Sequence, residues 1–298
     1  MLQRLTPAIT SPLLRLRLPS SKLSITAASA RSLSTQSTHD TSESTKFGAL
    51  ASSWYPSKPA SSLMPPETLT PPPRNPLLEM NPHRISFTLS HLPTEEYTNI
   101  TALDVGAGGG IATGSLLGLG MGVTAVEPSI ELCELLKTRY DDTDLKIHNG
   151  PLETLPSTQK YHLTTAFEII EHLAPNTLPS FIENLTSVTT STIVISSISK
   201  TLTSLLKCKL APELIGIVPW GTHEYSKFVP PETLIKLMKE NEWECVKHEE
   251  MRIEGGLLSE IEFGVRGRGG VWEEGEGGGN YVMAFKPCSS SSSSGENR

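Results

Sequence analysis

The stretch Leu103-Asp104-Val105-Gly106-Ala107-Gly108-Gly109-Gly110 decides the fold of this chain. A short apolar strand runs into a glycine cluster, and Ile111 to Leu119 then has the pattern of a helix. Strand, tight turn and helix form the first half of a nucleotide-binding βαβ unit. Gly106 and Gly108 can adopt backbone angles closed to other residues, and they bring the main chain against a ligand without an intervening Cβ. The sequence therefore predicts a loop that contacts a ligand closely.

The same loop argues against a dinucleotide as that ligand. The GxGxxG fingerprint requires a third glycine for close helix–strand packing, and this chain has Ile111 at that position. The next apolar run, Gly122 to Glu127, ends in a carboxylate about 20 residues past the first glycine, where a ribose-binding acid is expected. Glu127 is therefore predicted to accept hydrogen bonds from both ribose hydroxyls. The alternative is a carboxylate that caps the helix beginning at Ser129.

Together, the GxGGG loop and the acid behind it resemble motif I and the acidic loop of class I S-adenosylmethionine (SAM) methyltransferases. The resemblance implies a SAM site and does not indicate which molecule accepts the methyl group. Helical and strand patterns alternate from residue 130 to 198, which predicts a doubly wound α/β fold with a mostly parallel sheet. Two further strand patterns follow at 244–252 and 280–286. A seven-stranded, Rossmann-like sheet with a terminal antiparallel strand is the architecture of that superfamily.

Composition excludes several other classes of protein. The 298 residues carry a formal net charge of -7, so no nucleic-acid partner is expected. The cysteines are dispersed without a CxxC pair, which fits a reducing compartment and argues against a structural zinc or a disulfide framework. No stretch reaches the ~18 consecutive apolar residues that a membrane-spanning helix needs.

The two ends of the chain differ in composition from the middle. Residues 1–33 resemble a mitochondrial transit peptide, because arginines lie among leucines and serines and no acid precedes Asp40. Arg31-Ser32-Leu33-Ser34 indicates cleavage after Leu33, and a merely basic tail is the alternative. Residues 34–80 are predicted to be a disordered and Pro-rich arm, since the prolines between 54 and 82 exclude regular helix. The methyltransferase domain is expected over 81–287, followed by a disordered Ser-rich tail at 288–298.

An acidic cluster follows Phe167, the last residue of a predicted strand. Ligands of open α/β sheets bind at the carboxyl ends of strands. Glu168, Glu171 and His172 bring two carboxylates and an imidazole within one helical turn. Two oxygens and one nitrogen, with room left for water, suit Mg²⁺ better than a closed zinc site. The alternative is that the two glutamates cap the next helix while His172 packs locally.

Several segments resemble the ubiquinone biosynthesis O-methyltransferases of mitochondria and bacteria. They are Asn81-Pro82-His83-Arg84, the Gly106 loop, Glu168 to His172, and above all Val218-Pro-Trp-Gly-Thr-His223-Glu-Tyr-Ser-Lys227-Phe. This resemblance implies a SAM site made by Arg84, Gly106, Gly108, Glu127 and Phe167. It also implies an Mg²⁺ site made by Glu168, Glu171 and His172. The implied substrates are polyprenylated catechols methylated on a ring hydroxyl, with His223 as a candidate base or an ordering residue of its own loop.

The chain also departs from the pattern of that family. Tyr55 and Tyr225 stand where tryptophans are expected, Glu127 replaces the usual Asp, and Val188-Thr-Thr-Ser-Thr192 replaces a Pro-Gly-Gly turn. No departure removes a SAM or metal ligand, although together they alter the expected substrate pocket. Two alternatives therefore stay open: a non-catalytic assembly subunit, and a methyltransferase for another small catechol or for nitrogen.

The stretch Leu202 to Val218 predicts an element that lies on a membrane surface. It carries leucines and isoleucines beside Lys207 and Lys209, which suits contact with anionic lipid. A plain substrate lid is the alternative. Because the implied substrate keeps its tail in the bilayer, the chain is expected to be peripheral on the matrix side of the mitochondrial inner membrane. Other ubiquinone biosynthesis enzymes are expected as partners in a complex.

Overall fold

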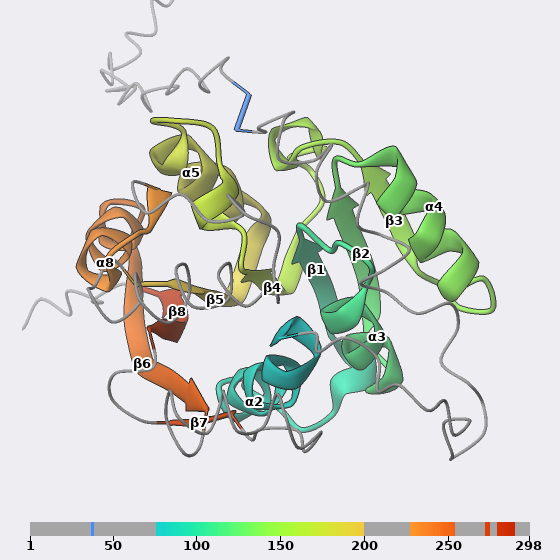
Figure 1. Ribbon diagram of the computed structural model, residues 1–298, viewed down its shortest axis with the longest axis horizontal. Helices are drawn as coiled ribbons and strands as arrows, with labels where there is room; N and C mark the ends of the chain where they lie inside the picture. Colours follow the sequence, from blue (N-terminus) through green and yellow to red (C-terminus); the bar gives the residue numbers. More distant parts are fainter. Residues whose placement is uncertain (1–36, 39–75, 200–226, 254–271, 275–278, 290–298) are drawn as a thin grey trace, which may run out of the picture. The chain divides into compact units, whose positions relative to one another are not determined.

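The computed structural model describes residues 37–38, 76–199, 227–253, 272–274 and 279–289, all within the unit Ser34–Arg298. In these residues eight strands form one sheet in the order β3-β2-β1-β4-β5-β8-β6-β7 (Figure 1). The parallel strands are β1 (Thr101–Val105), β2 (Gly122–Glu127), β3 (Lys146–Asn149), β4 (Tyr161–Phe167) and β5 (Thr189–Ile198). The antiparallel strands are β8 (Asn280–Pro287), β6 (Trp243–Ile253) and β7 (Trp272–Glu274). The predicted doubly wound sheet with its antiparallel end is confirmed.

Two predictions about the secondary-structure elements are wrong. A seven-stranded sheet is predicted, yet β7 lies between the strand patterns expected at 244–252 and 280–286 and adds an eighth strand at the edge beside β6. The proline-rich stretch 54–82 is predicted to exclude regular helix, yet helix α2 covers Pro76–Ser90. Pro76 occupies the first helical position, where a missing N–H costs no hydrogen bond. Pro82 removes one helical donor, and Met80 and Phe87 are buried on either side of it.

Helices cover both faces of the sheet (Figure 1). Strand β1 shows the alternation, because Leu103 and Val105 belong to the core cluster of one face while Ala102 belongs to the cluster of the other. The first face is covered by α5 (Leu178–Val188) and α8 (Pro231–Glu240), and the second by α2, α3 (Ile111–Gly118) and α4 (Ile130–Arg139). Burial on both faces explains why β1 and β2 consist mainly of apolar residues.

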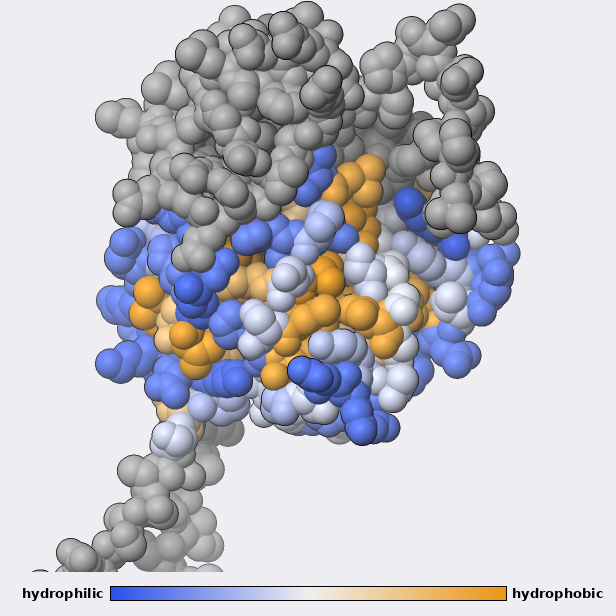
Figure 2. All heavy atoms as spheres, turned by 90° about the horizontal axis from the view of Figure 1, so that it is seen from below, coloured by the Kyte–Doolittle hydropathy of each residue, from blue (hydrophilic) through white to orange (hydrophobic). Residues whose placement is uncertain are grey.

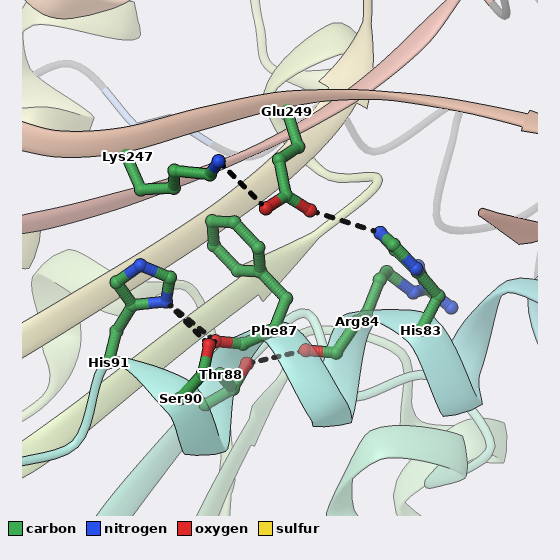
Figure 3. Close-up of polar contacts among 8 residues, drawn as sticks. All are labelled: His83, Arg84, Phe87, Thr88, Ser90, His91, Lys247 and Glu249. Carbon is green, nitrogen blue, oxygen red and sulfur yellow. Dashed lines mark hydrogen bonds and ion pairs between the residues drawn. The ribbon is translucent and has the colours of Figure 1, made fainter. Parts of the chain in front are cut away.

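Helix α2 is tied to the antiparallel end of the sheet by charged side chains (Figure 3). Nε2 of His83 lies 3.5 Å from Oε2 of Glu249 on β6, and Nζ of Lys247 lies 3.3 Å from the other oxygen of that carboxylate. One turn further along, the rings of Phe87 and His91 lie 4.5 Å apart. The contact between His83 and Glu249 ties the helix that carries Arg84 to β6.

Apolar side chains gather on the side of the molecule on which α2 lies (Figure 2). Leu78 of α2 is exposed, and Leu77, Ile85 and Leu89 are only partly buried against the core. In the ranges that the structure describes, no helix is long and apolar enough to cross a membrane. The stretch Leu202 to Val218, which the sequence predicts to contact lipid, lies outside those ranges.

Thr38 packs between two loops at the carboxyl edge of the sheet. Its N–H and its hydroxyl donate to the two oxygens of Glu153, at 2.8 and 2.7 Å. Its carbonyl accepts a hydrogen bond from the N–H of Ala174 at 3.0 Å. Glu153 belongs to η2 (Leu152–Thr154) after β3, and Ala174 follows η3 (Ile170–His172) after β4. The predicted disorder of the whole arm 34–80 is therefore wrong at Thr38, which is 3% exposed.

Replacing Thr38 should test whether this contact stabilises the fold. Thr38→Val keeps the side-chain shape and removes the hydroxyl donor, so we expect the free energy of unfolding of residues 34–298 to fall by about 1 kcal/mol. Thr38→Ser keeps the donor and should stay close to wild type. Urea unfolding followed by circular dichroism measures both, and a Thr38→Val chain as stable as wild type would contradict the role.

Candidate active site

The glycine loop between β1 and α3 leaves no room for a side chain at its first position. Gly106 and Gly108 both adopt the left-handed conformation, with φ of 67° and 55°. A Cβ added to Gly106 would lie 1.9 Å from Cδ1 of Ile169. The N–H of Gly106 and that of Ala107 donate to the carbonyl of Val126 on β2, at 2.8 and 3.1 Å. The sharp turn predicted from the sequence is therefore present, and it joins the ends of β1 and β2.

Glu127 lies at the end of β2 with its carboxylate against this loop. Oε2 accepts a hydrogen bond from the N–H of Gly108 and Oε1 from the N–H of Ser129, both at 2.9 Å. Burial raises the pKa of Glu127, which is 6% exposed. Each oxygen keeps a further lone pair that can accept from a ligand hydroxyl. The helix after β2 does not depend on Glu127 for its cap, because the hydroxyl of Ser129 accepts a hydrogen bond from the N–H of Leu132 at 3.3 Å.

Asp104 is a site residue that the sequence reasoning did not single out. It is 2% exposed, and its carboxylate accepts hydrogen bonds from the hydroxyls of Thr113 at 2.6 Å and Thr165 at 2.9 Å. Burial raises the pKa of Asp104 even though these bonds and the nearby charge of Arg84 act to lower it. An acid inside an otherwise apolar strand is costly to bury. This unfavourable placement is the sequence feature from which a role for Asp104 could have been predicted.

Arg84 reaches from α2 to the end of β4, as the sequence predicts. Its guanidinium carbon lies 4.9 Å from the ring centre of Phe167, and Nη1 lies 3.9 Å from Oε1 of Glu168. Nη2 donates to the carbonyl of Leu77 at 2.9 Å. Because Arg84 is 3% exposed, its charge acts in an environment poorly screened by water. The structure thus brings Arg84, Phe167 and Glu168 together.

The two glutamates of the acidic cluster lie beside each other, with Glu171 buried and Glu168 10% exposed. Glu168 has a left-handed backbone (φ of 53°), and its carboxylate accepts from the Ser196 hydroxyl at 2.8 Å and the Asn280 amide at 3.2 Å. Oε2 of Glu171 accepts from the Ser197 hydroxyl at 2.7 Å. Burial, followed by the charge of Glu171, raises the pKa of Glu168 to about 8. Because two neighbouring carboxylates are difficult to ionise together, this pair favours the binding of a positive charge.

The third predicted metal ligand does not join this pair. Among the described residues, no three His, Cys, Asp or Glu side chains are grouped so that they could hold a metal ion. His172 ends η3 and is partly buried, with its N–H donating to the carbonyl of Ile169 at 2.8 Å. His223, the candidate base, lies outside the described residues. Three further residues beside the two glutamates were not predicted from the sequence, because they belong to no local motif. They are Ser196, Ser197 and Asn280.

A substitution at Gly106 should show how strictly the loop is constrained. Gly106→Ala forces a Cβ into the left-handed region, at a cost of about 1–2 kcal/mol, and displaces Ile169. We expect a larger loss of stability than this backbone cost alone, measured by urea unfolding. The double variant Gly106→Ala/Ile169→Ala removes the clash, so its loss should be smaller than the sum of the two single losses. Strict additivity would contradict the steric account.

The raised pKa of Glu168 predicts a pH dependence of stability. The folded state holds this proton more tightly than the unfolded chain, whose carboxyl titrates near its usual 4.5. Stability should therefore fall as pH rises from about 5 to about 8 with divalent cations chelated. Glu168→Gln mimics the neutral carboxyl and should flatten this fall, while Asp104 and Glu127 act equally in both proteins. Parallel profiles of unfolding free energy against pH would refute the assignment.

Comparison with known proteins agrees with this geometry. A family model described as a methyltransferase domain matches residues 102–191. The mitochondrial ubiquinone biosynthesis O-methyltransferase of Schizosaccharomyces pombe is 35% identical over 153 residues, 47% of this chain and 54% of that protein. The mitochondrial ubiquinone biosynthesis O-methyltransferase of Rattus norvegicus is 30% identical over 226 residues, 70% of this chain and 61% of that protein. The chain thus spans less than two thirds of either relative.

A solved structure shows the same fold. The magnesium protoporphyrin IX methyltransferase of Synechocystis PCC 6803, with bound SAH, aligns with a TM-score of 0.51 and 12% identity, over 70% of this chain and 84% of that chain. Residues 102–191 therefore match a methyltransferase domain, the fold is that of a solved methyltransferase, and the chain is similar to the ubiquinone biosynthesis O-methyltransferases of Schizosaccharomyces pombe and Rattus norvegicus.

Proposed function

We propose that this enzyme methylates a ring hydroxyl of a polyprenylated catechol in ubiquinone biosynthesis. The observation that carries the proposal is the position of the neighbouring pair Glu168 and Glu171 after β4. Strand β4 lies beside β1, whose end carries the glycine loop, and β1 lies beside β2, whose end carries Glu127. One site of this kind can hold a methyl donor and a hydroxylated ring next to each other. The names of the similar proteins support the pathway.

The methyl donor would be held by residues of three strand ends. Glu127 would accept hydrogen bonds from the ribose hydroxyls, Gly106 and Gly108 would let the backbone approach closely, and Arg84 with Phe167 would close the side toward α2. SAM supplies a methyl group made electrophilic by the sulfonium charge. Buried carboxylates such as Asp104 favour a cationic ligand over a neutral one, because low dielectric strengthens the attraction.

Glu168 and Glu171 have the chemistry of a site for a divalent cation. Their carboxylates are adjacent, and Oε1 of Glu171 has no hydrogen-bond partner. Oxygen donors suit Mg²⁺, and His172 is proposed as a further ligand that would have to turn toward the pair. The cation would supply positive charge that lowers the pKa of a catechol hydroxyl.

The protein's own part in the transfer is to orient the acceptor and to remove a proton. The new O–CH₃ bond forms as the S–CH₃ bond breaks, and the hydroxyl proton leaves to a base, for which His223 is the candidate. Holding the acceptor oxygen in line with the methyl group is a positioning task that can supply about 7 kcal/mol or more of the barrier reduction.

The location of the enzyme is proposed from the composition and from the mitochondrial relatives. Residues 1–33 would direct the chain to mitochondria, and the mature enzyme would lie on the matrix side of the inner membrane as a peripheral protein. Leu202 to Val218 would contact the lipid from which the prenyl tail of the substrate emerges. Other ubiquinone biosynthesis enzymes would then be its partners in a complex.

A product assay tests the proposed reaction. Residues 34–298 should transfer the methyl group of SAM to a short-chain prenyl catechol in the presence of Mg²⁺, with the product identified by mass spectrometry. Glu168→Ala and His172→Ala should each lower kcat/KM at least about tenfold, since a lost metal ligand or its support typically costs 10–100-fold. Unchanged activity in both would rule out the metal role.

The same assay separates the two other candidate functions. A non-catalytic assembly subunit would give no methylated product with any acceptor. An enzyme for another small acceptor would methylate an unprenylated catechol or an amine in preference to the prenyl catechol.

A further inference from the structure

The two glutamates are held by residues from the far side of β4. Ser196 and Ser197 stand near the end of β5, and Asn280 begins the antiparallel strand β8. Ser197 pairs in register with Tyr281, next to the pair formed by Ile198 and Asn280. The antiparallel end of the sheet thus supplies the polar groups that surround Glu168 and Glu171.

The two carboxylates are held in different ways. Both oxygens of Glu168 accept hydrogen bonds, one from the Ser196 hydroxyl and one from the Asn280 amide. Glu171 accepts one, at Oε2, from the Ser197 hydroxyl at 2.7 Å. Its Oε1 is buried without a hydrogen-bond partner, in a residue that is 3% exposed. Glu171 is therefore the carboxylate with an unsatisfied oxygen.

An unsatisfied buried carboxylate oxygen is costly, by roughly 1–3 kcal/mol or more for a charged group. Native proteins seldom leave such an atom unpaired, so the atom indicates a missing ligand. A neighbouring carboxylate repels an anion and attracts a cation, which makes a divalent cation the ligand that suits the pair.

Ser197 is itself held firmly by the next strand. It lies opposite the fully buried Tyr281, whose phenol donates to the carbonyl of Val229 at 3.0 Å. Tyr281 is too deeply buried to move easily, and Ser197 is 0% exposed. The hydroxyl of Ser197 is therefore fixed before any ligand arrives.

We propose that Ser197 is a positioning residue that holds Oε2 of Glu171 and so keeps Oε1 available as a ligand oxygen for a divalent cation. This inference rests on the proposed function only for the identity of the reaction that uses the cation. Ser196 and Asn280 hold the two oxygens of the neighbouring Glu168. The antiparallel strand pair then contributes to the chemistry although it provides none of the ligands.

Binding of Mn²⁺ to residues 34–298, followed by the loss of the free-ion electron paramagnetic resonance signal, tests the proposal. Ser197→Ala should weaken Mn²⁺ affinity 10–100-fold, as the loss of a supporting hydrogen bond to a metal ligand does elsewhere. Ser197→Thr keeps the hydroxyl and should restore affinity to within a few-fold. Ser191→Ala removes a hydroxyl near the other end of β5, where Ser191 is only partly buried, and should change nothing.

The affinity for SAH, measured by calorimetry on the same proteins, reports whether each variant is folded. It should stay within twofold of wild type while the Mn²⁺ affinity falls. If Ser197→Ala does not fold, Ser197→Cys provides a weaker donor of similar size and should give an intermediate Mn²⁺ affinity.

Equal Mn²⁺ affinity in wild type and Ser197→Ala would overturn the proposal, and so would a wild-type chain that binds no Mn²⁺. A wild-type chain that binds Mn²⁺ with the expected Ser197 dependence, yet methylates no prenyl catechol, would support the positioning role and reject only the proposed reaction.

Discussion

The turn at Gly106 is the constraint on which the site depends. At this residue the chain leaves β1 in a left-handed conformation, with its N–H bonded to Val126 of β2 and its α-carbon against Ile169, which follows β4. One glycine thereby sets the separation of the ends of three neighbouring strands. A Cβ at this position would meet the side chain of Ile169, so glycine lets the loop after β1 lie against the residues that follow β4.

The second organising feature is an excess of buried negative charge. Among the described residues at this edge, Asp104, Glu127 and Glu171 are buried, and Glu168 is 10% exposed. Arg84 is a buried cation beside them. Hydroxyl and amide donors lessen the cost of burying these carboxylates. Burial still raises the pKa of Asp104, Glu127 and Glu168, which shows that the compensation is incomplete. A site with this balance favours a cationic ligand over a neutral one.

Local sequence patterns predict the half of the site that is built from contiguous residues. The glycine loop, Glu127 and the acidic run after Phe167 each follow a strand directly, so the topology of a doubly wound sheet places them at one edge. Arg84 could be placed as well, because Asn81-Pro82-His83-Arg84 resembles a segment of the ubiquinone biosynthesis O-methyltransferases. Residues that act across the sheet could not be found in this way. Ser197 meets Glu171 through pairing of strands distant in sequence, and an isolated serine in a strand carries no signal of its own.

Helix α2 and Thr38 show a different limit of sequence reasoning. The known effects of proline predict only the local conformational and hydrogen-bond cost of a helix. They do not include the free energy gained when Met80 and Phe87 are buried. Composition likewise describes the arm as a whole and cannot single out Thr38, whose order comes from Glu153 in a loop after β3.

The most direct test of the account is calorimetric titration of residues 34–298 with SAH. The account predicts one site per chain, with an affinity that Glu127→Ala weakens at least about tenfold, because hydrogen bonds to a charged group contribute about 1.5–3 kcal/mol. Absence of binding, or an affinity unchanged by Glu127→Ala, would contradict the claim that the ends of β1 and β2 form the cofactor site.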